Sequence, residues 1–221
     1  MAVHEKMQVM KPFTIHKVDG GSERSAWLNL RKQFVTATDW PQITGTSPWG
    51  NAQAVMLEKA SDLVEDEGSE IAVPLRVGKQ LEPIIAKAIK KQWDRGQYLY
   101  PAFVARRHLG FTPDIARIDI PSGWLLGEIK VSVKDWRGAV PPVYLDQVRF
   151  QATVLGINQV QIIHLHLSSW EEGEGMIAAG VVPPGRLEWF EVLVTDRERA
   201  SIERRAERWW QMHVQPHLSN P

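Results

Sequence analysis

The sequence contains no cysteine. This absence excludes structural disulfides and thiolate zinc sites, and it is compatible with a reducing cytoplasm. Long apolar runs are missing too, because no stretch approaches the roughly 18 residues that a membrane-spanning helix needs. Residues 1–11 carry charges where a signal peptide would be apolar. We therefore expect a soluble, cytoplasmic protein without a membrane segment.

A net charge is also missing, since 26 Lys and Arg balance 26 Asp and Glu. Nucleic-acid-binding proteins are often strongly basic, so this balance at first disfavours such a function. Seven of the acidic residues, however, lie in two stretches, 65–70 and 171–174, which we expect to be surface loops. The rest of the chain is basic, and a neutral protein can bind DNA through a local basic channel. Candidate basic surfaces are Arg76 with Lys79, Arg106 with Arg107, and Lys130 with Lys134 and Arg137.

Internal repeats, low-complexity tracts and convincing linkers are not found in the 221 residues. With 43% apolar residues, a chain of this length can bury one sizeable core. We therefore expect a single domain over residues 1–221.

What the sequence does contain is an acidic motif within a predicted hairpin. Asp114 follows Thr112-Pro113, and residues 121–123 supply turn chemistry before Glu128-Ile129-Lys130. Because side chains alternate along a strand, Glu128 and Lys130 should share one face, while Ile129 points to the other and is available for a core. Two chemically active groups are therefore predicted to lie on one side of a strand.

These residue types suit phosphodiester hydrolysis, which needs cations that neutralise the developing charge and a water of lowered pKa. Asp114 and Glu128 are hard oxygen ligands of the kind that Mg²⁺ prefers, and the backbone carbonyl of Ile129 could add another oxygen. Lys130 is a compact charge that could hold the attacking water or the scissile phosphate. Short motifs of this kind also arise by chance, and the alternative is an exposed hairpin whose polar residues face solvent.

A helix is predicted over residues 77–93, because apolar residues recur there at helical spacing. Glu82 lies on or beside the apolar stripe, where a carboxylate is costly unless it is paired or binds a metal. Pro83 disfavours helical geometry at Glu82, so we expect the helix to begin at Pro83 with Glu82 just outside it. The alternative role for Glu82 is that of a first-turn acid favoured by the helix dipole.

A second amphipathic helix is predicted over residues 142–156, and it ends at a glycine. Tyr144, Gln147 and Gln151 fall on one face of this helix, at positions i, i+3 and i+7. Uncharged hydrogen-bonding groups in this arrangement suit the positioning of a phosphate or a water near a metal. The alternative is an ordinary polar helix surface.

Other patterns predict the scaffold. Strands are expected at residues 98–105, 159–167 and 189–194. Thr195 to Glu198 fits a capping box that opens a charged final helix. We expect Trp209 and Trp210 of that helix to dock on the core or on a neighbouring subunit.

Two further features have a plain structural interpretation. His164 and His166 lie on one face of a predicted strand, but such pairs are more often packing or surface residues than metal ligands, so we leave them out of the site. Ten tryptophans exceed the nine Phe and Tyr residues combined, and core packing is the default role for them. Trp49 is the best candidate for stacking on an unwound base, because a turn rarely buries an indole completely.

Taken in order, the motifs resemble those of the lambda-exonuclease type of phage recombination (alkaline) exonuclease, within the PD-(D/E)xK nuclease superfamily. The matching pieces are Trp27 to Arg31 with Thr36-Ala37-Thr38, Gly78 to Glu82, Thr112-Pro113-Asp114, Glu128-Ile129-Lys130, and Tyr144 with Gln147. Five ordered motifs are much more specific than any one of them. Thr38 stands where a serine is more usual, and the region beyond Gly156 matches only loosely, so no function is assigned there.

The resemblance implies an α/β fold with a mixed central β-sheet flanked by helices, the restriction-endonuclease-like core. It implies that Asp114, Glu128 and Glu82, with the backbone carbonyl of Ile129, hold the metals. Lys130 would orient the nucleophilic water. Tyr144 and Gln147 would complete the wall of the active site.

The same resemblance makes Arg31 and Thr38 candidates for binding the phosphate at a DNA 5′ end, since an arginine fork suits a terminal phosphate. Two alternatives remain for these residues. Arg31 could be the solvated end of a helix over residues 23–32, and Thr38 could cap a helix that starts near Asp39, a task for which Thr36 competes.

The function implied is a 5′-to-3′ exonuclease that uses two Mg²⁺ ions, with Mn²⁺ as a substitute. It would degrade one strand of linear double-stranded DNA from a 5′-phosphorylated end and leave single-stranded DNA for recombination. The implied assembly is a ring-shaped homotrimer around DNA, with a single-strand annealing protein as partner. The alternatives are an endonuclease or repair nuclease of the same superfamily, and a non-catalytic DNA-binding protein on a nuclease scaffold.

Overall fold

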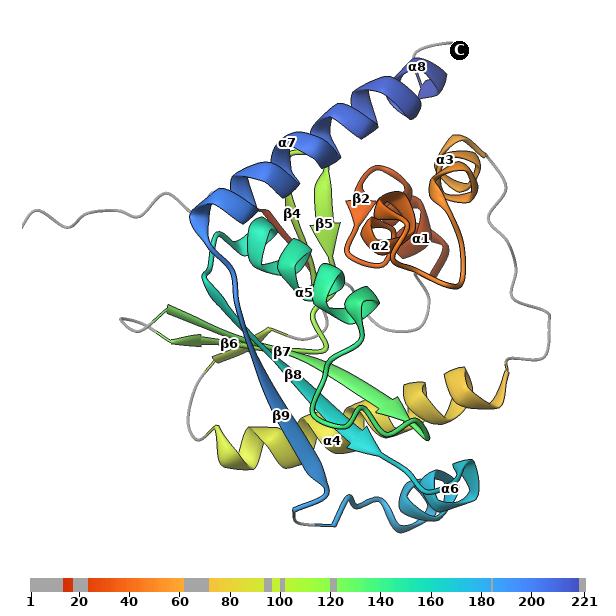
Figure 1. Ribbon diagram of the computed structural model, residues 1–221, viewed down its shortest axis with the longest axis vertical. Helices are drawn as coiled ribbons and strands as arrows, with labels where there is room; N and C mark the ends of the chain where they lie inside the picture. The colour runs from red at the N-terminus through yellow and green to blue at the C-terminus, as the bar shows by residue number, and fades with distance from the viewer. Residues whose placement is uncertain are drawn as a thin grey trace, which may run out of the picture.

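Two β-sheets with helices around them form the structure, a computed structural model that describes residues 14–17, 24–61, 72–93, 97–99, 102–119, 123–183 and 185–218 (Figure 1). The described strands of one sheet run in the order β3-β6-β7-β8-β9, and those of the other in the order β1-β4-β5-β2. The first sheet contains β3 (Gln97–Leu99), β6 (Ile115–Asp119), β7 (Gly123–Ser132), β8 (Gln159–His166) and β9 (Leu187–Leu193). The second contains β1 (Thr14–Lys17), β4 (Ala102–Arg106), β5 (Leu109–Phe111) and β2 (Val35–Thr36).

The larger sheet is mixed, as predicted. β6 and β7 form an antiparallel hairpin in which Ile115 lies opposite Gly127, whereas β7 and β8 are parallel. A parallel pair needs a crossover connection, and α5 (Pro142–Leu155) provides it. The predicted strand-turn-strand unit around the acidic motif is thereby confirmed, with residues 120–122 of its turn outside the described part.

Helices pack on both faces of this sheet. α4 (Val73–Gln92) and α6 (Trp170–Ala179) share one apolar cluster with Ile129 and Ile163. α5 and α7 (Asp196–His213) share the other cluster with Leu126 and Ile162. The remaining described helices are α1 (Arg24–Lys32), α2 (Trp40–Thr44), α3 (Ala52–Ala60) and α8 (Gln215–Leu218). Within the described residues, no helix has both the length and the apolar character needed to cross a membrane.

The ends of α5 and α7 follow the expected local rules. α5 ends at Gly156, whose φ of 71° is a left-handed conformation that glycine adopts without strain. α7 starts with the predicted capping box, in which the Thr195 hydroxyl accepts from the Glu198 amide and the Glu198 carboxylate accepts from the Thr195 amide. Trp210 is 3% exposed and belongs to the core, which confirms the expected docking of this helix (Figure 1).

The expected start of the upstream helix is wrong. α4 begins at Val73, so Pro83 lies inside it and Glu82 is a helical residue rather than a flanking one. Val77, Leu81 and Ile85 are fully buried along one continuous stripe that passes Pro83. Packing of an amphipathic face contributes more to helix stability than local propensity does, and here it outweighs the hydrogen bond lost at a proline.

Two other expectations also need correction. The strand expected at residues 98–105 is two strands, because β3 pairs with β6 while β4 pairs with β5 in the other sheet. The sequence places a proline, which has no amide hydrogen, between them. Residues 171–174 are not a loop but lie at the start of α6, where acidic side chains are favoured by the helix dipole. The other acidic stretch, 65–70, lies outside the described residues.

Two glycines lie near the acidic motifs, and replacing each by alanine should change the stability of the fold in opposite directions. A Cβ at Gly127 would lie 2.7 Å from Ile163 Cδ1 and 2.8 Å from Ile115 Cγ2, so Gly127→Ala should lower the free energy of unfolding by about 1–3 kcal/mol. A Cβ at Gly78 would meet no described atom within 4 Å, so Gly78→Ala should raise that free energy by about 0.4–1 kcal/mol. Urea unfolding of the parent and both variants measures whether the free energy of unfolding falls or rises in each variant. Changes of equal sign would contradict this account of the packing.

Candidate active site

Asp114 lies in the turn between β5 and β6, where its carboxylate is fixed to the neighbouring strand. Its Oδ2 atom accepts a 2.7 Å hydrogen bond from the backbone amide of Ile129 on β7. The Ile129 side chain packs into the cluster beneath α4, as expected from the alternation of side chains along the strand. The core therefore holds the strand, and the strand holds the Asp114 carboxylate beside Glu128 and Lys130.

Glu128 is a buried carboxylate that accepts hydrogen bonds from three side chains. It is 2% exposed. Its Oε1 atom accepts hydrogen bonds from Lys130 Nζ at 2.6 Å and from Gln147 Nε2 at 2.5 Å, and its Oε2 atom accepts from Gln151 Nε2 at 2.6 Å. The predicted common face of Glu128 and Lys130, and that of the two glutamines on α5, are both confirmed. Burial of this charge is tolerated because the donors replace lost hydration.

Gln151 is the functional candidate that the family motif misses. It is 1% exposed, and its Oε1 atom has no hydrogen-bond partner among the described residues. Its place on the helix face of Tyr144 and Gln147 was visible in the sequence, but only the structure shows that its amide binds Glu128.

Lys130 is held between a carboxylate and an aromatic ring. Its ammonium lies 2.6 Å from Glu128 Oε1 and 5.0 Å from the ring centroid of Tyr144. Burial lowers the pKa of Lys130, but the Glu128 and Asp114 carboxylates raise it more, so the pKa lies above its ordinary value. Lys130 therefore stays positively charged at neutral pH.

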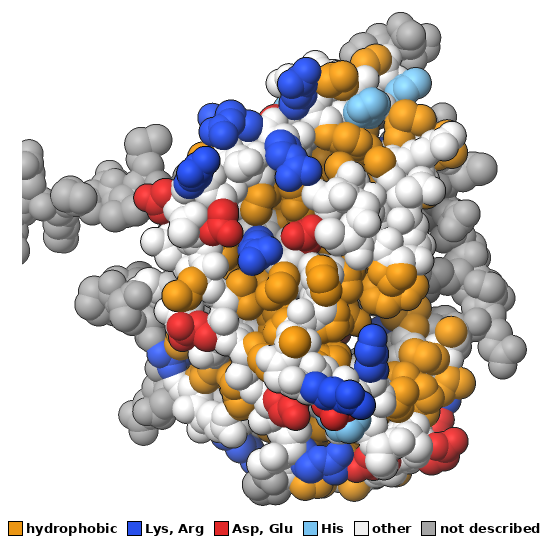
Figure 2. Space-filling model, in the orientation of Figure 1, with side chains coloured by type: hydrophobic (Ala, Val, Ile, Leu, Met, Phe, Trp, Pro, Cys, Tyr) orange, Lys and Arg blue, Asp and Glu red, His pale blue; other side chains and the backbone are white. Residues whose placement is uncertain are grey.

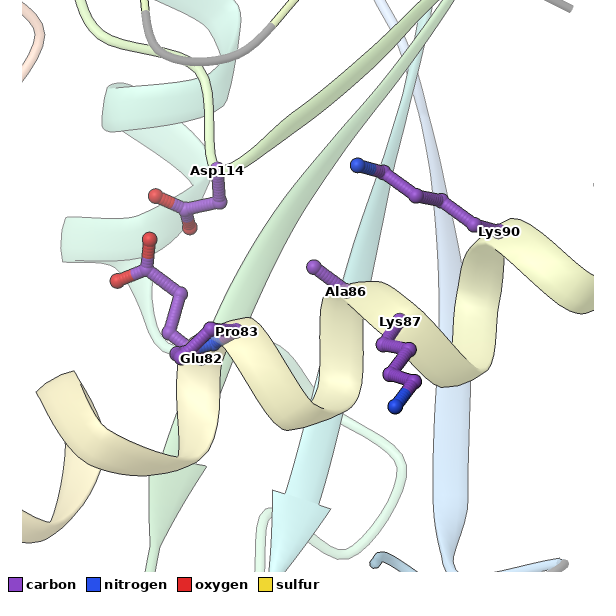
Figure 3. A pocket seen from close by; sticks show the side chains of 6 residues that line it. All are labelled: Glu82, Pro83, Ala86, Lys87, Lys90 and Asp114. Carbon is purple, nitrogen blue, oxygen red and sulfur yellow. The ribbon is translucent and has the colours of Figure 1, made fainter. Parts of the chain in front are cut away.

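Glu82 reaches this region from α4 and faces Asp114 across a pocket. Figure 3 shows the two carboxylates pointing toward one another. The pocket has a volume of about 160 Å³ and is also lined by Pro83, Ala86, Lys87 and Lys90. Acidic and basic side chains thus border one space, in which an ion or a phosphate can be bound by groups of opposite charge.

The three carboxylates repel one another. Burial raises the pKa of Asp114 well above its ordinary value, and Glu128 and Glu82 raise it further, while Lys130 and the Ile129 amide oppose them. Burial and then Glu128 raise the pKa of Glu82 against the lysines Lys130 and Lys79. One buried ammonium does not compensate three acids, so a further cation would bind favourably here.

The donor chemistry fits a divalent cation. Mg²⁺ takes hard oxygen ligands and is usually bound by one or two protein carboxylates together with several waters. Asp114 and Glu82 are such a pair, since they face one pocket. No group of three His, Cys, Asp or Glu side chains within the described ranges is arranged to hold a metal ion. Glu128 is engaged with Lys130 and the two amides instead, and it would have to give up one of these bonds to become a ligand.

Arg31 and Thr38 form a second polar group near the start of the chain. Arg31 Nη2 donates a 2.9 Å hydrogen bond to Thr38 Oγ1, and its guanidinium lies 4.6 Å from the ring centroid of Trp27. Thr36 Oγ1 lies 2.9 Å from Thr38 Oγ1. Arg31 is therefore more than a solvated helix end. Thr38 does not cap α2, whose N-cap residue is Asp39, whereas the Thr36 hydroxyl accepts a 3.3 Å hydrogen bond from the Asp39 amide.

A buried ion pair supports this second group. Lys59 Nζ lies 2.8 Å from Asp39 Oδ2, with both side chains almost fully buried, and it also donates to the backbone carbonyl of Arg31 at 3.3 Å. Asp39 Oδ2 accepts a further bond from the Thr36 amide at 2.7 Å. The pair joins α3 to the N-cap residue of α2 and to the end of α1. No sequence motif predicted it.

The segment that follows Thr38 is joined to α5. Thr44 and Thr46 each donate a hydrogen bond to Asp146 Oδ2, at 2.9 and 2.8 Å. Asp146 precedes Gln147, which binds Glu128. One helix therefore contacts both the acidic cluster and the segment that carries Thr38.

His164 is a packing residue, as expected. It is fully buried, its two ring nitrogens contact Glu188 and Ser132 at 2.9 and 3.0 Å, and its ring stacks on Trp136 at 3.7 Å. Because desolvation lowers the pKa of His164 more than Glu188 raises it, the ring is neutral at neutral pH. His166 lies beside it, 6.2 Å between ring centroids.

The predicted basic surfaces are partly neutralised. Arg76 pairs with Glu174, and both Arg106 and Arg107 approach Glu203 within 4 Å. Figure 2 shows Lys and Arg side chains gathered instead over α7 along the upper part of the face in view, with apolar side chains exposed across the middle. These arginines alternate with acidic residues along α7, so the helix carries only a small excess of positive charge.

Because the pKa of Asp114 is raised, its ionised carboxylate should lower the stability of the folded protein. Above the ordinary pKa of about 4, the unfolded state ionises more readily than the folded state, so stability is lost as pH rises toward the folded pKa. Asp114→Asn keeps an acceptor for the Ile129 amide but removes the charge. In a chelator at neutral and alkaline pH the variant should therefore melt at a higher temperature than the parent, and the difference in melting temperature should disappear below pH 4.

Added Mg²⁺ should stabilise the parent more than the variant. A parent at least as stable as the variant in chelator at pH 8 would contradict this assignment.

A family model matches part of the sequence. Residues 26–108 match the YqaJ-like viral recombinase domain. The match includes Arg31, Thr38 and Glu82 and ends before Asp114. No match is found among curated proteins.

Solved structures with a similar fold include exonucleases. An alkaline exonuclease from Laribacter hongkongensis matches with a TM-score of 0.58 and 14% identity, covering 87% of this chain and 94% of that one. Its complex with dAMP gives a TM-score of 0.59 at the same identity and coverage. A phage-related exonuclease from Haemophilus somnus 129PT gives 0.57 and 16% identity, covering 86% and 97%. The predicted restriction-endonuclease-like fold is thereby confirmed. The chain matches the YqaJ-like viral recombinase domain over residues 26–108 and the fold of the exonucleases over most of its length. These matches support a nuclease. The chain thus resembles phage-type alkaline exonucleases, as its motifs predicted.

Proposed function

We propose that this chain is an exonuclease that degrades one strand of linear double-stranded DNA, in the 5′-to-3′ direction, from a 5′-phosphorylated end. The single-stranded DNA that remains would serve recombination. The observation that carries the proposal is that Asp114 and Glu82 line one pocket, while Glu128 beside them is hydrogen-bonded to the Lys130 ammonium. Metal-assisted phosphodiester hydrolysis requires acids beside a cation, whereas a module that only binds DNA does not.

The cofactor would be Mg²⁺, with Mn²⁺ as a substitute. Asp114, Glu82, Glu128 and the backbone carbonyl of Ile129 would hold two ions, since all four supply hard oxygen atoms. When bound, the ions supply charge neutralisation at the phosphate and lower the pKa of the attacking water.

The other residues of the site would position the reactants. Lys130 keeps its proton, so it would donate hydrogen bonds to the attacking water or to a phosphate oxygen instead of removing a proton. The Tyr144 ring supports the ammonium from one side, a contact that stabilises a cation by about 0.5–2 kcal/mol. Gln147 and Gln151 would orient the Glu128 carboxylate, which they already bind.

Arg31 and Thr38 would bind the terminal 5′ phosphate. Their hydrogen bond brings a guanidinium and a hydroxyl to one point. A phosphate oxygen is a stronger acceptor for Arg31 than the hydroxyl, and it leaves the hydroxyl proton free to bind a second phosphate oxygen. Recognition of a terminal phosphate distinguishes an end from a continuous strand, which favours an exonuclease over an endonuclease.

A solved relative supports release of single nucleotides. The alkaline exonuclease from Laribacter hongkongensis has been solved in complex with dAMP. A deoxynucleoside monophosphate is the product expected when an exonuclease removes one nucleotide at a time. Binding of this compound by a similar fold favours the same product for this chain.

The assembly belongs to the same proposal. We propose a ring of three copies around the DNA, a single-strand annealing protein that receives the product, and a single domain over residues 1–221 that acts in the cytoplasm. These elements rest on the motif resemblance.

Cleavage should depend on Asp114 and Lys130. Asp114→Ala and Lys130→Ala should each lower the rate of nucleotide release from a linear duplex in Mg²⁺ by at least about 10²–10³-fold, because each removes a group that stabilises the transition state. Glu191→Ala is the matched control, since this exposed carboxylate binds Gln159 and lies on β9, two strands away from the β7 strand that carries Glu128 and Lys130. Undiminished cutting by the Asp114 variant would refute the site, and efficient cutting of a closed circular duplex would favour an endonuclease.

Arg31 should determine the preference for a phosphorylated end. Arg31→Ala should reduce the ratio of cleavage rates for 5′-phosphate over 5′-hydroxyl ends by about ten- to a hundredfold, the effect of losing a hydrogen bond to a charged group. Arg76→Ala is the matched control, because Arg76 pairs with Glu174 on the surface. An unchanged ratio in the Arg31 variant would remove Arg31 from the site.

A further inference from the structure

Trp49 is the most exposed large apolar side chain in the described part of the chain. It is 70% exposed and lies in the turn between α2 and α3. Most tryptophans of a folded protein are largely buried, so this indole offers an aromatic face to a ligand that most tryptophans do not.

The turn that carries Trp49 is firmly built. The amides of Thr46 and Ser47 donate to the Pro41 carbonyl at 2.9 and 3.0 Å, and the Thr46 hydroxyl binds Asp146 on α5 at 2.8 Å. The Trp49 amide donates to the Ser47 hydroxyl at 3.2 Å. The exposure of the indole is therefore a fixed property of an anchored turn.

Trp49 lies beside Tyr144 of one polar group, and its neighbour Gly50 packs on a residue that is bonded to the other group. On one side its ring centroid lies 6.2 Å from that of Tyr144, whose ring supports the Lys130 ammonium at 5.0 Å. On the other side, Gly50 packs so closely against Gln42 that an added Cβ would clash with the Gln42 amide oxygen. Gln42 in turn donates a 3.4 Å hydrogen bond to the Thr38 carbonyl.

This placement has a consequence for a bound DNA end, and it rests on the proposed function. If Thr38 and Arg31 bind the terminal phosphate and Lys130 lies at the bond to be cut, the nucleotide to be removed spans the space between them. An indole at that place presents a flat aromatic face, which stacks on any of the four bases.

We propose that Trp49 stacks on the base of the 5′-terminal nucleotide and holds it away from its partner strand. The side chain is a positioning residue, because it contacts the base and not the reacting atoms. Stacking is tolerant of sequence, so the residue would favour an opened end without selecting a particular base.

The test compares two DNA ends in two proteins. The substrates are 5′-phosphorylated linear duplexes that carry either a normal nucleotide or an abasic residue at the 5′ terminus. The measurement is kcat/KM for release of the first nucleotide in Mg²⁺. With the normal end, Trp49→Ala should lower kcat/KM by about 5- to 150-fold, the range of base–aromatic stacking. With the abasic end, the same substitution should have no effect, because the base that it contacts is gone.

Controls separate stacking from other roles. Trp49→Phe should retain most of the activity on the normal end, and Trp189→Ala, which alters another exposed indole, should leave both substrates unaffected. An equal loss on both substrates would overturn the proposal and would point to a role that does not involve the base, such as a contact with another copy of the chain. No loss on either substrate would also overturn it. If the proposed function itself fails, the parent protein releases no nucleotide from either duplex, whereas failure of the Trp49 proposal leaves the parent active.

Discussion

The gathering of three carboxylates beside a single ammonium is the constraint on which the rest of the site depends. Burial, Glu128 and Glu82 raise the pKa of Asp114, burial and Glu128 raise that of Glu82, and Lys130 offsets only part of both shifts. The protein stabilises Glu128 with two amides and Asp114 with a backbone amide. An excess of negative charge remains at the pocket between α4 and the turn before β6. This charge favours the binding of a divalent cation.

Helix α5 connects this cluster to the part of the chain that contains Thr38. One of its faces supplies Gln147 and Gln151 to Glu128 and the Tyr144 ring to Lys130, while Asp146 binds the turn after α2. A helix anchored at both groups fixes their separation. A DNA end that contacts both the acids and the proposed phosphate-binding residues, Arg31 and Thr38, would therefore meet a preformed site.

Much of this arrangement could be predicted from local patterns. Strand alternation placed Glu128 and Lys130 on one face and Ile129 in the core, and helical spacing placed Gln147 and Gln151 together, because these relations depend only on backbone geometry. The start of α4 could not be predicted, since burial of Val77, Leu81 and Ile85 outweighed the local effect of Pro83. The Lys59–Asp39 ion pair was invisible for a related reason: it joins residues of two helices that only tertiary packing brings together.

The most direct test of the central claim is the location of a bound cation. Crystals soaked in Mn²⁺ and measured at the manganese absorption edge reveal the ion by its anomalous scattering. We expect a peak between the carboxylates of Asp114 and Glu82, with Glu128 turned toward it from at least one of its amide partners. A manganese peak elsewhere, with these carboxylates unchanged, would contradict the account.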